Sequence, residues 1–158
     1  MAQTHGWSAR LTELGITLPS VVPPVAAYVP SVRTGNHVYT SGQLPMVEGK
    51  LTAVGKVGAD VSADDATAAA RICALNALAA VDALVGIDSV VRIVKVVGFV
   101  ASAEGFTGQP GVVNGASELL GEVFGEAGAH ARSAVGVAAL PLGAAVEVEL
   151  IAEVEPEQ

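Results

Sequence analysis

The chain has little of what nucleic-acid binding or disulfide bonding requires. Its 158 residues include only 8 Lys and Arg against 16 Asp and Glu, which gives a formal net charge of −8. Because nucleic-acid binding depends on basic side chains that neutralise phosphates, no nucleic-acid partner is expected. Cys73 is the only cysteine, so an intrachain disulfide is excluded. In its Ala-rich surroundings, we expect Cys73 to be a small buried side chain rather than a reactive thiol.

Familiar signatures of catalysis are also missing. The chain has no P-loop, no G-x-G-x-x-G after a strand, and no C-x-x-C or H-E-x-x-H motif. His5, His37 and His130 have no spacing that suggests a metal site, and we expect them in turns or at the surface. Ser41 lacks the G-x-S-x-G frame of a nucleophile elbow. The sequence therefore gives no support to these nucleotide, zinc or serine-hydrolase chemistries.

No secretory signal or membrane span is expected. The N-terminal MAQTHGWSARL lacks the apolar core of a signal peptide, and the Ala-rich segment at residues 66–85 carries Arg71, Asn76 and Asp82. A reduced, cytoplasmic setting fits these features. Yet the composition is 51% hydrophobic and the mean hydropathy is +0.54, which is more apolar than a soluble monomer should be. This surplus predicts surface that is buried between subunits.

Turn residues and hydrophobic periodicities predict an α+β fold. The expected elements are a short helix at 7–15 capped by Ser8, a proline-rich arm at 16–30, a hairpin turning at 34–37, a turn at 48–50, a helix from Ser62 to Gly86, a strand at 90–101, a helix at 111–124 and two strands within 131–154. We expect one main domain at 25–154, with the short helix and arm at 1–24 before it and a tail at 155–158.

The two longest predicted strands suggest how the layers pack. Residues 144–154 alternate between apolar and partly acidic positions, as in a strand with one buried face. In the strand at 90–101, Val91, Ile93, Val97 and Phe99 point one way and Val90, Val94, Val96 and Val100 the other. Apolar residues on both faces predict burial on both faces. The result is a two-layer sandwich: a mixed, mostly antiparallel sheet with two main helices on one face and a partner subunit on the other.

Arg132 and Glu147 are the charged residues with most chemical interest. If a short loop joins their strands, they lie opposite one another as a cross-strand pair. One interpretation is a structural ion pair worth about 0–1 kcal/mol if it is exposed. The other is a site where Arg132 binds a substrate carboxylate and Glu147 handles water or a proton. Spacing alone leaves both open.

Several segments resemble the reactive-intermediate deaminase family, also called Rid or YjgF-like. They are Tyr28, the run VYTSGQLP at 38–45, Val113-Asn114, and above all residues 131–141, which fit an R-S-x-V-x-V-x-x-L-P signature. The likeness covers roughly residues 25–154 and is to a longer branch with an extra N-terminal segment. Two positions depart from the family pattern: Ala134 stands where a cysteine is common, and residues 26–30, AAYVP, replace a G-P-Y-S context.

This resemblance implies a chorismate-mutase-like fold, a homotrimer with clefts between neighbouring subunits, and no metal or organic cofactor. The implied reaction is hydrolysis of reactive 2-imino or enamino acids to 2-oxo acids and ammonia, of the 2-iminobutanoate/2-iminopropanoate type. Arg132 would bind the substrate carboxylate and Glu147 would position water. The cleft would be lined by Tyr28, Ser41, Gly42, Asn114 and, through its backbone, Ala134.

Other functions are weighed against this one. The alternative is a trimer that binds small 2-oxo acids without turning them over. An endoribonuclease, a label often attached to the family, fits less well with the acidic charge and the lack of an obvious His pair. A chorismate mutase would be a fold-level analogy only. We expect a small carboxylate ligand, no nucleic acid and no membrane, with the proline-rich arm packing across the domain and narrowing the cleft.

Overall fold

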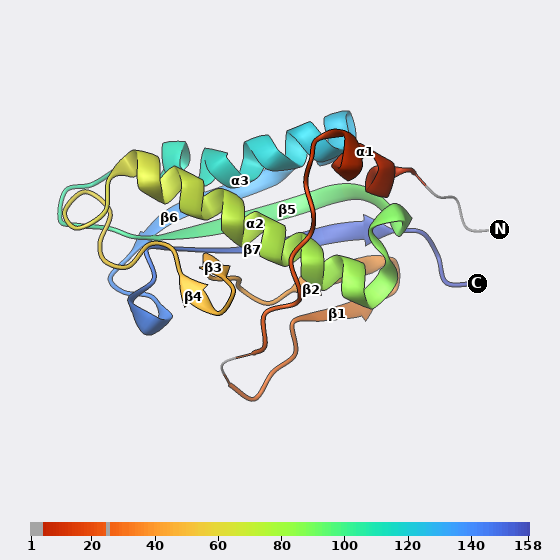
Figure 1. Cartoon of the computed structure of the whole chain (residues 1–158), viewed down its shortest axis with the longest axis horizontal. Helices are drawn as coiled ribbons and strands as arrows, with labels where there is room; N and C mark the ends of the chain where they lie inside the picture. The colour runs from red at the N-terminus through yellow and green to blue at the C-terminus, as the bar shows by residue number, and fades with distance from the viewer. Residues whose placement is uncertain (1–4, 25) are drawn as a thin grey trace.

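A computed structural model describes residues 5–24 and 26–158. Helices α2 (Ala63–Val85) and α3 (Gln109–Phe124) form one layer over a five-stranded sheet, and the short α1 (Trp7–Glu13) packs at one end (Figure 1). The strands are β1 (Ser31–Thr34), β2 (His37–Thr40), β5 (Val90–Ala101), β6 (Ala131–Val137) and β7 (Val146–Val154), with β3 (Met46–Val47) and β4 (Lys50–Leu51) forming a separate hairpin. Short 3₁₀ turns occupy Ile87–Ser89, Gly125–Gly128 and Pro141–Gly143.

The main sheet has the order β1-β2-β7-β5-β6. Strands β5 and β6 are parallel because α3 crosses over between them, and every other neighbouring pair is antiparallel. The predicted two-layer α+β sandwich, with two main helices on one face of a mostly antiparallel sheet, is therefore confirmed.

One predicted pairing is wrong. The strands that carry Arg132 and Glu147 do not pair with each other, because β5 lies between them. The register pairs Val96 of β5 with Arg132 on one side, whereas Glu147 pairs with Phe99 on the other. The loop at 138–145 thus carries the chain across β5 instead of closing a hairpin.

Helix α2 has the predicted ends and forms the centre of the core. The Ser62 hydroxyl accepts a hydrogen bond from the Asp65 amide (3.1 Å), and Gly86 follows the last helical residue. By length and composition α2 is long and apolar enough to cross a membrane, contrary to our expectation. Here it is a core helix, with a buried face made largely of alanines that includes Cys73.

Two local predictions differ from the structure. Ser8 does not cap α1; its hydroxyl and amide both donate to the Asp88 carboxylate, and Gly6 precedes the helix. In β5, the register shifts between Val90 and Arg92 and again between Ile93 and Lys95. These irregularities reset the alternation, so Ile93 is fully buried with Val96 instead of sharing a face with Phe99.

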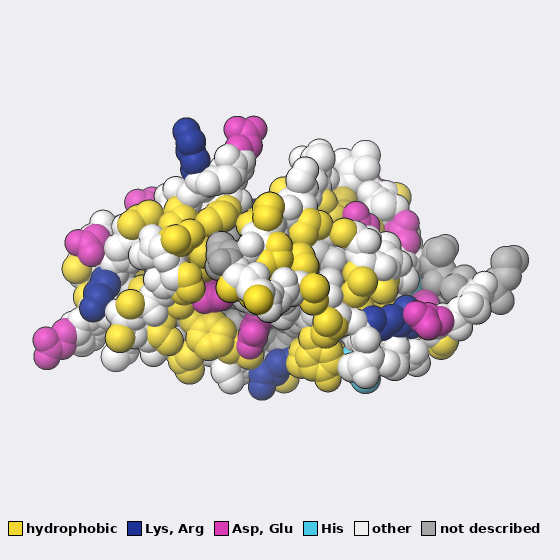
Figure 2. Space-filling view, turned by 90° about the horizontal axis from the view of Figure 1, so that it is seen from below, with side chains coloured by type: hydrophobic (Ala, Val, Ile, Leu, Met, Phe, Trp, Pro, Cys, Tyr) yellow, Lys and Arg dark blue, Asp and Glu magenta, His cyan; other side chains and the backbone are white. Residues whose placement is uncertain are grey.

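The second face of the sheet carries apolar side chains that remain exposed in the single chain. Val32, Tyr39 and Val135 are 49%, 42% and 43% exposed, and Val97, Phe99 and Ile151 are half-buried. Apolar side chains also spread over the side of the molecule seen in Figure 2, around a few carboxylates. An apolar sheet face of this kind is typical of an interaction surface.

Candidate active site

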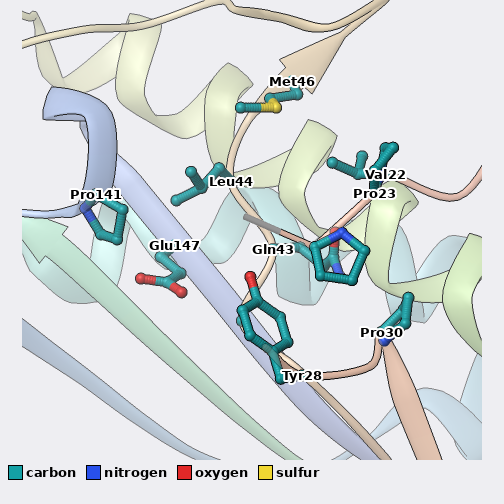
Figure 3. Close-up of a pocket in the computed structure, with 11 residues that line it drawn as sticks. Val22, Pro23, Tyr28, Pro30, Gln43, Leu44, Met46, Pro141 and Glu147 are labelled. Carbon is teal, nitrogen blue, oxygen red and sulfur yellow. The ribbon is translucent and has the colours of Figure 1, made fainter. Parts of the chain in front are cut away.

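Glu147 lies in a small cavity built by segments far apart in the sequence. Val146 and Val148 are buried in the core, so alternation along β7 turns Glu147 to the opposite face. The cavity has a volume of about 40 Å³, enough for water or a small reacting group. Its lining comprises Val22, Pro23, Pro24, Tyr28, Pro30, Gly42, Gln43, Leu44, Met46, Pro141 and Glu147 (Figure 3).

The segment after β2 is fastened directly beside Glu147. The Gln43 amide donates to the Val148 carbonyl (2.8 Å), and the Val148 amide donates back to the Gln43 carbonyl (3.0 Å). This bridge presses Gly42 against the Glu147 side chain so closely that a Cβ at residue 42 would overlap the carboxylate. A Cβ there would push the flexible Glu147 side chain aside, so the glycine allows the carboxylate to keep this position.

The environment of Glu147 favours its neutral form. Burial, and then the negative charge of Glu149 two residues along the same face, raise the pKa of the Glu147 carboxyl. A carboxyl with a raised pKa can both accept and return a proton closer to neutral pH. Cys73 lies behind β7, and burial raises the pKa of its thiol as well, so it stays protonated and unreactive, as predicted.

The proline-rich arm packs across α2, as predicted, and reaches the cavity (Figure 1). Val22, Pro23 and Pro24 line the cavity that contains Glu147. Tyr28 follows at the end of the arm, and its ring projects into the same cavity (Figure 3). The arm thus narrows access to the carboxylate.

Arg132 forms a second cluster with helix α3. Its Nη1 donates to Asn114 Oδ1 (2.7 Å) and to Ser117 Oγ (3.2 Å), and its Nη2 donates to the Pro110 carbonyl (3.3 Å). All three acceptors are neutral, and within the described residues no carboxylate lies within ion-pair distance of this guanidinium. A guanidinium has five N–H donors, so these bonds leave two of them for a ligand.

Ser117 and His130 support this arrangement, and sequence reasoning missed both. His130 Nδ1 lies 2.6 Å from the Gly128 carbonyl and must donate to it, because a carbonyl only accepts. In the neutral ring, Nε2 then accepts from the Ser117 hydroxyl (2.8 Å), whose oxygen accepts from Arg132. His130 is therefore a half-buried, hydrogen-bonded residue rather than the turn or surface residue we expected. Its place two residues before Arg132, immediately ahead of β6, was the available signal, because residues two apart in an extended chain point to the same side.

The predicted site residues fall into two groups within one chain. Tyr28, Gly42 and Glu147 line the small cavity, and Ser41 lies beside it with its hydroxyl donating to the Val29 carbonyl. Arg132 and Asn114 form the other group, and Ala134 shares the helix-facing side of β6 with Arg132.

The two groups lie on opposite faces of the sheet. Arg132 pairs with the core residue Val96 and contacts α3, whereas Glu147 points away from the core. One chain therefore does not bring the guanidinium and the carboxylate together, and the expected cross-strand pair does not form. Among residues 5–24 and 26–158, no group of His, Cys, Asp and Glu side chains is arranged to hold a metal ion.

This fold and these residues define a chorismate-mutase-like α+β protein with a conspicuous arginine and a separate, half-buried glutamate. The family model described as "YjgF/chorismate_mutase-like, putative endoribonuclease" matches residues 8–154. The chain therefore belongs to the YjgF/chorismate-mutase-like family. It is 46% identical over 148 residues to protein TCP17 of Trypanosoma cruzi, covering 92% of each chain.

Solved structures agree with this assignment. The protein Atu1372 of Agrobacterium tumefaciens, described as of unknown function, is 47% identical with a TM-score of 0.84, over 94% of this chain and 91% of that one. A "putative endoribonuclease" from Shewanella oneidensis is 34% identical with a TM-score of 0.89, over 94% and 99%. RidA from an Antarctic Psychrobacter is 29% identical with a TM-score of 0.61, over 85% and 94%.

Proposed function

We propose that the protein hydrolyses reactive 2-imino or enamino acids to 2-oxo acids and ammonia. The observation that carries this proposal is how the Arg132 guanidinium is bonded and which of its donors remain. Three neutral oxygens hold its guanidinium, no described carboxylate neutralises it, and two N–H donors remain. Such a group is suited to bind the carboxylate of a small acid through two hydrogen bonds. Membership in a family that contains RidA supports the same ligand chemistry.

Glu147 is the residue proposed to move protons. An iminium carbon is already electrophilic, so water can add to it once a base removes a proton. Glu147 takes that proton and the water oxygen bonds to the carbon, giving a carbinolamine. The carboxyl then returns the proton to the nitrogen, the C–N bond breaks, and the hydroxyl passes its proton to the departing ammonia as the carbonyl of the 2-oxo acid forms. The small cavity beside Glu147 has room for this water.

The two groups are proposed to meet between subunits of a homotrimer, with Arg132 of one chain facing Glu147 of the next. Each group is ordered by its own hydrogen bonds or packing, yet β5 separates them within a chain. The apolar sheet face that carries Tyr39 and Phe99 offers a surface for association. Positioning by two chains would supply the orientation that this reaction mainly needs.

The test is hydrolysis of imino acids generated in situ by an amino-acid oxidase. The parent protein should accelerate loss of the imine above the buffer rate. Arg132→Ala should lower kcat/KM by about 10- to 100-fold, because a charge-assisted contact to the substrate is lost. Arg92→Ala is the matched control: that arginine is exposed on β5, and among the described residues its side chain bonds only to the Ala129 carbonyl. Full activity of Arg132→Ala would remove the proposed mechanism.

Two other functions have separate outcomes in these experiments. Tight binding of 2-oxo acids by calorimetry, without turnover of any imino acid, would favour a non-catalytic metabolite-binding protein. The Shewanella protein carries an endoribonuclease description, but here the net charge of −8 opposes contact with phosphates. Cleavage of RNA that is abolished by Glu147→Gln would overturn our preference.

A further inference from the structure

A second and much larger cavity lies under the proline-rich arm. It has a volume of about 580 Å³ and is enclosed by three segments: the arm at 17–23, the β3–β4 turn at 46–49, and one side of α2. Ligand pockets commonly measure about 300–1,000 Å³, so this space is large enough for an organic side chain. The residues around it are Thr17, Pro19, Ser20, Val21, Val22, Pro23, Met46, Val47, Glu48, Gly49, Ile72, Leu75 and Asn76.

This arm cavity adjoins the one that contains Glu147. Val22, Pro23 and Met46 line both. Figure 3 shows these three side chains on one side of the small cavity and Glu147 with Pro141 on the other. A molecule whose reacting carbon lies beside Glu147 therefore meets this shared wall at the border of the larger space.

Hydrogen bonds from α2 hold the shared wall in place. Asn76 of α2 is buried, and its Nδ2 donates to the carbonyls of Leu44 and Met46, at 3.0 Å each. These bonds fix the backbone of the segment that carries Met46. The wall nevertheless consists of side chains that adapt well to a ligand, above all the flexible thioether of Met46.

The two cavities differ in what they can hold. The space beside Glu147, about 40 Å³, accepts water and a reacting group but no bulky side chain. The arm cavity is lined mainly by Val, Ile, Leu, Met and Pro, with Thr17, Ser20, Glu48 and Asn76 as the polar members. Its chemistry favours an apolar substituent over a charged one.

We propose that the arm cavity is the side-chain pocket of the active site, and that it selects 2-imino acids with a bulky apolar side chain. Those derived from leucine, methionine or phenylalanine fit this description better than that derived from alanine. This inference rests on the proposed deaminase function. It assigns the N-terminal extension the role of forming the roof of the pocket.

The size of the expected preference follows from hydrophobic burial. Each buried methylene contributes about fourfold to binding, and a leucine side chain has three more carbons than alanine. The parent should therefore show a kcat/KM about 10- to 100-fold higher for the leucine-derived imino acid than for the alanine-derived one. Calorimetry should show the same order for 4-methyl-2-oxopentanoate over pyruvate.

The decisive variant is Ile72→Trp. Ile72 lines only the arm cavity, and a larger indole there occupies space that the ligand needs. The ratio of kcat/KM for leucine-derived over alanine-derived substrate should fall by at least about tenfold. Ala68→Trp, at an exposed position one turn earlier on α2, is the control and should keep the parent ratio.

Failure of this inference is distinguishable from failure of the proposed function. Equal kcat/KM for alanine- and leucine-derived substrates in the parent would overturn the side-chain pocket while leaving deamination intact. An unchanged ratio in Ile72→Trp would do the same. If no imino acid is turned over, deamination fails, and the calorimetric ranking of the two 2-oxo acids, with and without Ile72→Trp, still decides the pocket.

Discussion

At the scale of single residues, Glu147 and Glu149 give the most direct test of the chemistry. The two carboxylates lie on the same face of β7, and the charge of Glu149 adds to burial in raising the pKa of Glu147. If Glu147 is the base, activity is lost at low pH when it becomes protonated, so the acid limb of kcat/KM lies above the usual range of a glutamate. Glu149→Gln removes the like charge, lowers the pKa of Glu147, and should move that limb to lower pH.

The measurement is kcat/KM for one imino acid between pH 4 and 8. Glu153→Gln, on the same strand but not among the causes of the pKa shift, is the matched control and should leave the limb in place. Movement of the limb to higher pH in Glu149→Gln, or no movement, would contradict the assignment of Glu147 as the base.

At the scale of elements, the contact between α2 and α3 depends on a missing side chain. A Cβ at Gly115 would collide with the Thr67 carbonyl of α2, which is backbone and cannot move aside cheaply. Gly115→Ala should therefore destabilise the fold by about 1–3 kcal/mol, measured by urea unfolding at a fixed protein concentration.

Gly121 provides the control on the same helix. It is exposed, and nothing lies within 4 Å of a Cβ built there. Gly121→Ala should stabilise the protein by up to about 1 kcal/mol, because alanine loses less backbone entropy in a helix. If both substitutions stabilise the protein, the close contact between α2 and α3 does not exclude a side chain at residue 115.

The elements that sequence predicts well are those with local determinants. The ends of α2 follow from Ser62 and Gly86, and the alternation along β7 follows from a period of two. In β5 the predicted assignment of residues to the two faces failed at the bulges. An inserted residue resets the alternation of side chains, and the hydrophobicity pattern gives no sign of it. Ser8 failed as a cap for a related reason: its partner, Asp88, is 80 residues away.

At the scale of the whole molecule, the candidate site depends on strand order. The family resemblance pointed to Arg132 and Glu147 as candidate site residues, and their spacing in the sequence suggested a direct pair. The insertion of β5 between β6 and β7 is a long-range choice that neither strand encodes by itself. The arm cavity is equally non-local, since Val22, Met46 and Ile72 meet only after folding.

The strand order makes a prediction about how chains cooperate. If each site combines Arg132 of one chain with Glu147 of the next, Arg132→Ala and Glu147→Gln trimers should each keep only a small residual activity. Mixing the two variants, with unfolding and joint refolding to exchange subunits, then creates interfaces in which both residues are intact. Random assembly makes about a quarter of the interfaces complete, because each of the two required residues is present with a chance of about one half. Activity should recover to roughly that share of the parent.

Controls separate this result from trivial causes. Each variant refolded alone should stay at its residual activity, and a mixture left without subunit exchange should show no recovery above it. Sedimentation should give trimers for the parent, both variants and the mixture. Activity can recover only if the two residues act in one site from different chains. If each site lay within one chain, every chain in the mixture would still carry one of the two substitutions. A fully exchanged trimeric mixture whose activity stays at the residual level of the two variants would therefore exclude the intersubunit site. It would leave Arg132 and Glu147 as the separate clusters that the single chain contains.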